Sequence, residues 1–192
     1  MTNARPLLQI ITASTRRDRK GPAVAAWFER TALAHAGFEI EAVDLAEVNL
    51  PLLDEPNHPR FGNYQFEHTK AWSARVRRAD AFVFVTPEYN FSAPPSLVNA
   101  LDYLFHEWAY KPAGFVSYGG VSGGTRSVQM IKQIVTALKV MPMVEAVSIP
   151  FFTKFIDPSG AFNADETQNN AAAAMLTELR RWTDALTPLR KK

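Results

Sequence analysis

The sequence lacks cysteine altogether. This excludes a disulfide framework, thiolate catalysis, a Cys-ligated zinc site and an iron–sulfur cluster. Long apolar runs are also missing: the first, Pro6 to Ala13, is far too short for a signal peptide or a membrane span. The 21 basic and 19 acidic residues leave a net charge of +2, too small to indicate a nucleic-acid or membrane partner. We therefore expect a cytoplasmic protein.

Two further signatures are absent. The four histidines, at positions 35, 58, 68 and 106, show no metal-ligand spacing, so no metal site is predicted. The polar loop after the first apolar run contains neither a G-x-G-x-x-G fingerprint nor a Walker A sequence, which disfavours dinucleotide-binding and P-loop folds.

What remains is an ordinary globular composition, with 47% apolar and 21% charged residues. The length of 192 residues suits one domain with a sizeable core, and no repeat or linker divides it. We expect residues 1–192 to form a single domain.

Apolar runs and helical periodicities alternate along the chain, which predicts an α/β fold. The run Ala81–Val85 has no polar alternation and is typical of a strand buried on both faces, whereas Phe38–Val43 alternates and suits an edge strand. Further strands are predicted at 7–11, 113–117 and 143–149, and helices at 22–36, 67–77, 97–108, 122–138 and from a capping box at Asp165 and Gln168 onward.

Three of these strands run into loops rich in hydroxyl, aromatic and glycine residues. The loops begin Ser14-Thr15-Arg16, Glu88-Tyr89-Asn90 and Tyr118-Gly119-Gly120. In open parallel sheets, ligands bind outside the carboxyl ends of the strands, where the winding reverses. Ser and Arg before a helix could form an anion pocket or merely cap a solvated turn, and glycines could serve only a tight turn. Their coincidence at three strand ends favours a binding site.

These motifs, taken together and in order, resemble the NADPH-dependent FMN reductase family, whose relatives include quinone, azo-dye and chromate reductases. The resemblance runs from about Pro6 to Ile149. It is carried by Ser14-Thr15-Arg16 with Gly21-Pro22, Pro87-Glu88-Tyr89-Asn90, Asn99–Leu104 with Glu107-Trp108, and Ser117–Gly120 with Ser122-Gly123-Gly124. The family often has Gly where this chain has Ala13.

The resemblance implies a flavodoxin-like three-layer sandwich with a five-stranded parallel sheet in the order 2-1-3-4-5. It also implies an oxidoreductase that passes hydride from NADPH through bound FMN to quinones or similar acceptors. No catalytic side chain is expected, because the flavin carries the chemistry. By resemblance, the phosphate would be held by Ser14, Arg16, Pro22, Ala23 and Val24, and the isoalloxazine ring would be lined by Pro87, Glu88, Tyr89, Asn90, Ser117, Tyr118, Gly119 and Gly120.

Alternatives remain for three features. Glu88 could act as an acid–base group, and Glu107-Trp108 is expected to be a structural or subunit contact. A flavodoxin-like electron carrier, or a flavin-binding regulatory module without turnover, would fit the same motifs, although such carriers are often strongly acidic. Nothing in the sequence identifies the physiological acceptor or decides between NADPH and NADH.

A homodimer, possibly a tetramer, is expected from helix 122–138, which carries two apolar stripes although a sheet can cover only one. Either a second subunit or the C-terminal helix would cover the stripe of Met130, Ile134 and Met141. The connection 45–66 is expected to pack its apolar residues down, and residues 190–192 to form a frayed tail.

Overall fold

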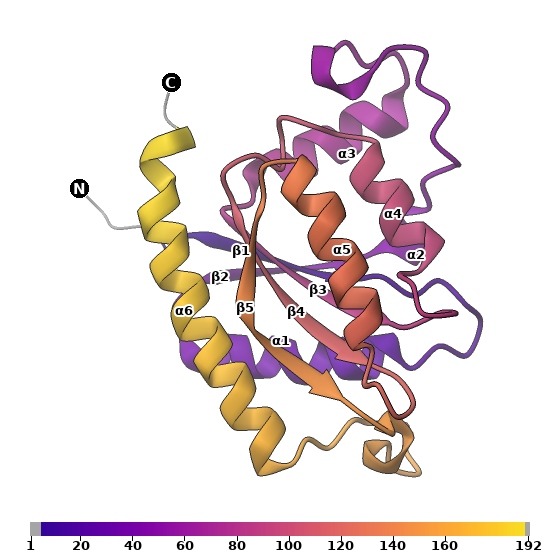
Figure 1. Cartoon of the computed structure of the whole chain (residues 1–192), viewed down its shortest axis with the longest axis vertical. Helices are drawn as coiled ribbons and strands as arrows, with labels where there is room; N and C mark the ends of the chain where they lie inside the picture. The colour runs from indigo at the N-terminus through magenta and orange to yellow at the C-terminus, as the bar shows by residue number, and fades with distance from the viewer. Residues whose placement is uncertain (1–4, 191–192) are drawn as a thin grey trace.

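The computed structural model describes residues 5–190 and contains one five-stranded sheet in the order β2-β1-β3-β4-β5. All four strand pairs are parallel, and helices cover both faces (Figure 1). The predicted strand order is therefore confirmed. The alternating strand β2 lies at one edge, as expected. No helix among residues 5–190 has the length and apolar character needed to cross a membrane.

The elements follow the predicted alternation. The strands are β1 (Leu7–Thr12), β2 (Glu39–Asp44), β3 (Ala81–Pro87), β4 (Pro112–Tyr118) and β5 (Met141–Ile149). The helices are α1 (Gly21–His35), α2 (Leu45–Val48), α3 (Glu67–Arg78), α4 (Pro95–Asp102), α5 (Thr125–Ala137) and α6 (Glu166–Arg190), with short 3₁₀ helices η1 (Pro59–Phe61) and η2 (Phe152–Phe155). The capping box of α6 is present: the backbone N–H of Asp165 donates to Gln168 Oε1 at 3.1 Å, and that of Gln168 to Asp165 Oδ1 at 2.9 Å.

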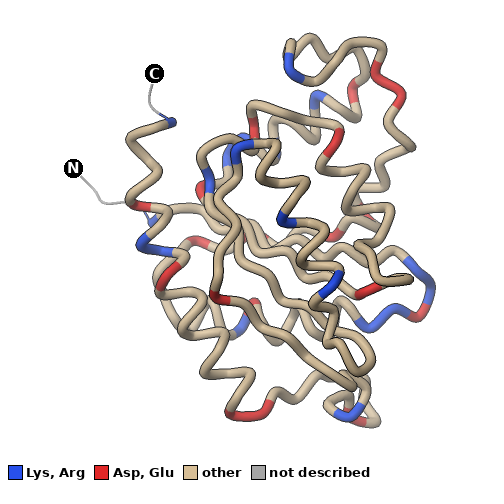
Figure 2. The backbone as a smooth tube through the Cα atoms, viewed as in Figure 1, with Lys and Arg blue, Asp and Glu red and all other residues tan. Residues whose placement is uncertain are grey.

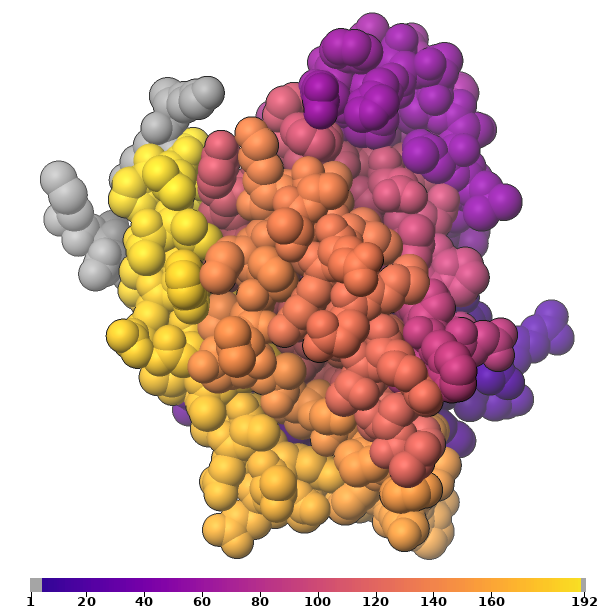
Figure 3. Space-filling view, viewed as in Figure 1, coloured from indigo at the N-terminus to yellow at the C-terminus, as the bar shows by residue number. Residues whose placement is uncertain are grey.

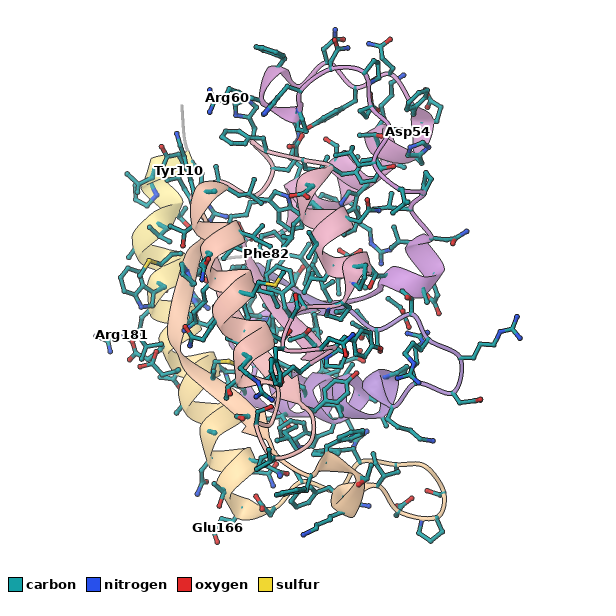
Figure 4. The ribbon with its side chains drawn as sticks, turned by 45° about the vertical axis from the view of Figure 1, so that its right-hand side comes forward. Asp54, Arg60, Phe82, Tyr110, Glu166 and Arg181 are labelled. Atoms are coloured by element: carbon teal, nitrogen blue, oxygen red, sulfur yellow. The ribbon has the colours of Figure 1, made fainter. Side chains whose placement is uncertain are left out.

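Two apolar layers sandwich the sheet. One contains Trp72, Leu101 and Ile131 and belongs to the side covered by α3, α4 and α5. The other contains Phe28 and Met175 and belongs to the side covered by α1 and α6. Every residue of β3 and β4 is buried, which explains why these strands read as continuous apolar runs. Phe82, labelled in Figure 4, lies at the centre of the first layer and packs against Trp108 at 4.9 Å between ring centroids.

Three expectations need correction. Helix α4 ends at Asp102, and the buried Trp108 lies beyond it in a series of turns. The connection 45–66 is only partly packed down: Leu50 and Tyr64 contact the core, whereas Leu52 and Phe61 are 81% and 76% exposed. This connection stands out from the upper end of the molecule (Figure 3). Arg190, expected to be frayed, pairs with Asp80 at 2.9 Å, while residues 191–192 of the expected tail lie outside the described residues.

Two glycines let α5 begin close against the ends of β4 and β5. Gly123 and Gly124 have φ of 59° and 84°, which side-chain-bearing residues rarely adopt. A Cβ on Gly124 would lie 2.8 Å from Ser117 Cβ and 2.9 Å from the backbone N of Tyr118. Helix α5 can therefore approach this strand end only because position 124 lacks a side chain.

We expect Gly124→Ala to lower the free energy of unfolding by about 3 kcal/mol, through left-handed strain and the clash with β4. Gly62→Ala is the matched control, because Gly62 shares the positive φ of 63° but would meet nothing within 4 Å. It should lose only the strain, about 1 kcal/mol. Urea unfolding of the protein without FMN measures both. Equal losses would show that the close approach of α5 contributes nothing.

Candidate functional site

The carboxyl ends of β1, β3 and β4 bring the three predicted loops around one cavity of about 300 Å³. Parallel pairing in register fixes this arrangement, since Thr12 lies opposite Val85 and Pro87 opposite Tyr118. The cavity is lined by Ser14, Arg16, Arg17, Asp18, Arg19, Lys20, Pro87, Glu88, Tyr89, Tyr118, Gly119, Gly120 and Phe152.

The loop between β1 and α1 contains a buried hydroxyl without a partner. Ser14 is 1% exposed, and its Oγ makes no hydrogen bond of normal geometry with the described residues, although it lies close enough to the Tyr118 hydroxyl to offset part of the rise that burial causes in the pKa of that group. A Cβ on Gly21 would lie 2.3 Å from Ser14 Oγ and 2.7 Å from the Tyr118 hydroxyl, so both hydroxyls lie against the first residue of α1. An unpaired buried hydroxyl costs about 1–3 kcal/mol, and it lies here at the positive end of a 15-residue helix. Both features favour an anion at this point.

The same loop is strongly basic, with four cationic residues between positions 16 and 20 (Figure 2). Arg19 is committed to the framework: its guanidinium donates to both carboxylate oxygens of Asp44 at 2.7 and 2.8 Å, and to the backbone O of Ser14 at 2.8 Å. Arg16 is exposed and makes no hydrogen bond among the described residues, and its guanidinium carbon lies 5.8 Å from the centroid of the Tyr89 ring. Arg19 therefore holds the loop while Arg16 keeps its donors available to a ligand.

The loop after β3 turns sharply at Asn90 and Phe91. Tyr89 and Ser92 exchange both backbone hydrogen bonds at 2.9 Å, and the two residues between them have φ of 49° and 66°. Such a two-residue turn requires positive φ at both central positions, which suits Asn but is unfavourable for Phe. Phe91 is nevertheless 68% exposed, so packing does not explain the conformation. Strain at an exposed loop tip beside a cavity is typical of functional sites.

The Glu88 carboxylate anchors this loop to α5. It accepts hydrogen bonds from Ser122 Oγ at 2.9 Å and from Nε of Arg126 at 2.6 Å. Burial opposes ionisation of Glu88, but the hydrogen bonds from Arg126 and Ser122 outweigh it and lower the pKa of the carboxyl. The Arg126 guanidinium also covers the Phe91 ring, 3.8 Å from its centroid. Glu88 is therefore a clamp between two loops and stays ionised at neutral pH, which argues against acid–base catalysis.

The loop after β4 forms the third wall. Burial raises the pKa of Tyr118 to about 12, so its hydroxyl remains protonated at neutral pH. The Gly119 N–H donates to Ile149 O at 3.2 Å, whereas the Gly120 N–H donates to no described residue. Of the two glycines, only Gly120 therefore has a backbone donor available for a ligand.

The residues implied by the resemblance separate into two groups. Eight of them line the cavity, from Ser14 to Gly120. Five do not: Pro22, Ala23 and Val24 lie in the first turn of α1, Asn90 lies in the strained turn, and the buried Ser117 hydroxyl donates to Gly123 O at 2.8 Å.

Sequence reasoning missed five lining residues: Arg17, Asp18, Arg19, Lys20 and Phe152. Four belong to the basic run after Arg16, whose charge was a usable signal. Phe152 lies beyond β5 and packs edge-on against Tyr118, with ring centroids 5.0 Å apart. No local pattern in the sequence predicts the contact between Phe152 and Tyr118.

Glu107 lies outside this cavity, and its role is structural. The carboxylate is 3% exposed and accepts hydrogen bonds from Ser73 Oγ at 2.6 Å, Tyr64 Oη at 3.0 Å and Arg77 at 2.9 Å. It thereby ties α3 and the end of the 45–66 connection to the turns after α4. The expectation of a structural contact is confirmed for Glu107.

We expect Glu88→Gln to lower the free energy of unfolding by about 1 kcal/mol at pH 7, because Arg126 is half-exposed and its pairing is screened by water. Since the folded-state pKa of Glu88 is lowered, its contribution is complete above the ordinary carboxyl pKa and is lost as pH falls through the folded value. The difference from wild type should therefore shrink as pH falls below the ordinary carboxyl pKa. Urea unfolding at several pH values measures it, with Glu67→Gln, in an exposed pair with Lys70, as control. A pH-independent difference would contradict the assignment.

Solved structures similar to this one share its fold. A flavoenzyme NAD(P)H:(acceptor) oxidoreductase, FerB, from Paracoccus denitrificans has a TM-score of 0.72 at 20% identity, covering 94% of this chain and 98% of the other. A flavodoxin from Streptococcus pneumonia has a TM-score of 0.59 at 13% identity, covering 91% and 98%. At these identities the likeness establishes the flavodoxin-like fold alone.

Sequence comparison is more specific. An NAD(P)H-dependent FMN reductase of Schizosaccharomyces pombe is 42% identical over 149 residues, which cover 76% of this chain and 74% of the relative. An NAD(P)H-dependent FMN reductase of Saccharomyces cerevisiae is 37% identical over 142 residues, covering 68% and 74%. An NADPH:quinone oxidoreductase of Arabidopsis thaliana is 38% identical over 101 residues, covering 51% and 50%. The family profile described as NADPH-dependent FMN reductase matches residues 6–154, and the chain belongs to that family of oxidoreductases.

Proposed function

We propose that the cavity at the carboxyl edge of the sheet binds FMN and that the protein passes hydride from NAD(P)H to quinones or similar acceptors. The observation that carries the proposal is the buried Ser14 hydroxyl, which lacks a partner beside the start of α1 and a basic loop. Relatives named as FMN reductases and quinone oxidoreductases support the same reaction class.

The phosphate would lie against Ser14, Arg16 and the first turn of α1. Arg16 offers charge-assisted donors, Ser14 offers a hydroxyl that is otherwise unsatisfied, and the helix start adds partial positive charge. Pro22 supplies no N–H, and the N–H groups of Ala23 and Val24 already donate to Lys20 O at 3.2 and 3.4 Å, so this turn would act through its partial positive charge. Gly21 matters because any side chain at that position would displace the Ser14 and Tyr118 hydroxyls.

The ring would lie along Tyr89 and the Tyr118–Gly120 segment, with Phe152 behind it. Gly120 contributes an available backbone N–H and, having no side chain, permits close approach. Such a fixed donor would stabilise negative charge at this end of the cavity without reorganisation. FMN held here would supply the hydride-transfer chemistry between nicotinamide and acceptor.

The protein's own contribution is positioning. Glu88 holds the loop after β3 against α5, and Arg19 holds the loop after β1 against Asp44. Glu88 is ionised and clamped by Arg126, and the raised pKa of Tyr118 makes its hydroxyl a hydrogen-bond donor rather than a base at neutral pH. This division of labour suits a reaction in which the cofactor carries the electrons.

The test is a two-stage experiment on purified protein reconstituted with FMN. Without air, NADPH should bleach the flavin spectrum, and a quinone should restore it. Turnover with both substrates should follow ping-pong kinetics. An electron carrier, the competing hypothesis, would bind FMN but oxidise NADPH negligibly in the presence of quinone. That result would overturn the proposed reaction while leaving FMN binding intact.

We also propose that the protein forms a homodimer through the face carrying α5. Helix α6 contacts β5, β4 and α1, so it covers the other side of the sheet and leaves the second apolar stripe of α5 without it. Met130 and Ile134 of that stripe are only half-buried, whereas Met141, expected on the same stripe, begins β5 instead. This placement of α6 supports a second subunit, rather than α6, as the cover of the stripe.

Light scattering at micromolar concentration should give twice the mass of the chain. Ile134→Lys should shift the protein to monomer, because a charge at an apolar interface is unpaired and desolvated. Leu33→Lys is the control, since Leu33 is 56% exposed on α1, on the opposite face. A monomeric wild type would refute the dimer.

A further inference from the structure

A second cavity, of about 620 Å³, lies away from the proposed flavin site. It is formed by residues just before β3, β4 and β5 and by the end of α6, and is therefore at the amino ends of strands whose carboxyl ends form the flavin site. Strands of seven residues separate the two by roughly 20 Å. The labelled Tyr110 marks this cavity, near the C-terminal end of α6 (Figure 4).

Four basic side chains line this cavity against two acidic ones, and the acids are already satisfied. Asp80 accepts from the backbone N–H of Leu7 with Oδ2 at 2.8 Å and pairs with Arg190 through Oδ1. Glu107 uses one oxygen on Ser73 and Arg77 and the other on Tyr64, as described above. Both carboxylates and their partners Arg77 and Arg190 therefore hold the framework together, and Lys111 and Lys139 remain as the two of the four basic side chains that make no ion pair with the described residues.

Lys111 is the buried member of the basic group, with 5% of its surface exposed. Its Nζ donates to the backbone O of Val76 at 2.9 Å and of Arg77 at 3.2 Å, at the end of α3. An ammonium group has three donors, and no oxygen or nitrogen among the described residues accepts the third; the Phe82 ring, with its centroid 5.4 Å from Nζ, is the remaining partner. A ring face is a weaker partner for a buried charge than an oxygen, so this position favours a ligand that accepts a hydrogen bond.

The other groups facing Lys111 come from every surrounding element. Arg77 ends α3, Arg190 ends α6, and Lys139 lies before β5, with its Nζ 3.5 Å from the Tyr110 hydroxyl. His106 contacts Arg60 O at 2.7 Å and adds a further titratable group at the edge. Burial and the charge of Arg190 lower the pKa of Lys111 to about 7, although Asp80 and Glu107 act in the opposite direction.

We propose that this cavity binds a small oxyanion, such as inorganic phosphate or sulfate, with the Lys111 ammonium as its buried ligand and Lys139 at its mouth. An entering anion would accept the third Lys111 hydrogen bond and neutralise the excess of positive charge. It would also favour the protonated amine, so binding should draw a proton from solution near neutral pH.

Calorimetric titration of sulfate into FMN-loaded protein tests this, at constant ionic strength set with sodium chloride. FMN keeps the phosphate pocket of the other site filled, and sulfate remains dianionic over the whole pH range. We expect saturable binding with a dissociation constant of about 1 mM or lower. Affinity should fall roughly fivefold or more from pH 6.5 to 8, because Lys111 loses its proton across that range. Buffers of different ionisation enthalpy should report uptake of about half a proton at pH 7.

Variants separate this site from general charge effects. Lys111→Met should abolish the saturable heat, and Lys139→Gln should weaken binding while preserving its pH dependence. Lys70→Met removes the same charge from an exposed position on α3 and should change nothing. If Lys111→Met fails to fold, the proton uptake of wild type remains decisive. Absence of saturable binding, pH-independent binding, or full binding by a folded Lys111→Met variant would overturn the proposal.

Discussion

Parallel pairing of β1, β3 and β4 is the constraint on which the rest of this structure depends. Because the three strands run in one direction and are aligned in register, their loops emerge at one edge, with Pro87 opposite Tyr118. The strands themselves are almost wholly buried and can carry no solvent-exposed chemistry. Polar and strained residues therefore lie in the loops. The site forms at the ends of the strands, where backbone groups are not used in strand pairing.

Each end of the sheet contains ion pairs that hold the fold together and a few polar groups that remain available to a ligand. At the carboxyl edge, Arg19 and Arg126 are neutralised by Asp44 and Glu88, and these pairs fix the loops rather than the ligand. The unpaired groups, Ser14 and Arg16, are left for an anion. At the amino edge, Asp80 likewise pairs with Arg190, and the buried Lys111 ammonium keeps one donor that no oxygen of the described residues accepts. At both edges, the ion pairs within the protein show which charged groups remain available to bind a ligand.

Local patterns in the sequence predicted the strands and the three loops well, because buried parallel strands and helix-capping residues leave strong signals, whereas the strand order was implied by the family resemblance. The capping box of α6 is an example of such a signal. Local patterns could not predict contacts made by distant segments. Phe152 reaches the cavity because its own N–H and that of Phe151 donate to Gly119 O and Gly120 O at 3.3 and 3.0 Å, thirty residues back along the chain. Leu52 and Phe61 show the opposite limit, since an apolar side chain does not by itself specify burial.

The central claim is that the buried Ser14 hydroxyl binds the phosphate of FMN. The most direct measurement compares the affinities of wild type and Ser14→Ala for FMN and for riboflavin, which lacks the phosphate. The account predicts that Ser14→Ala weakens FMN binding by roughly tenfold, equivalent to the loss of one charge-assisted hydrogen bond, and leaves riboflavin binding unchanged. Its apo form should be as stable as wild type, whereas Ser117→Ala, which loses a satisfied hydrogen bond, should be less stable. Equal losses for FMN and riboflavin, or none for either, would contradict it.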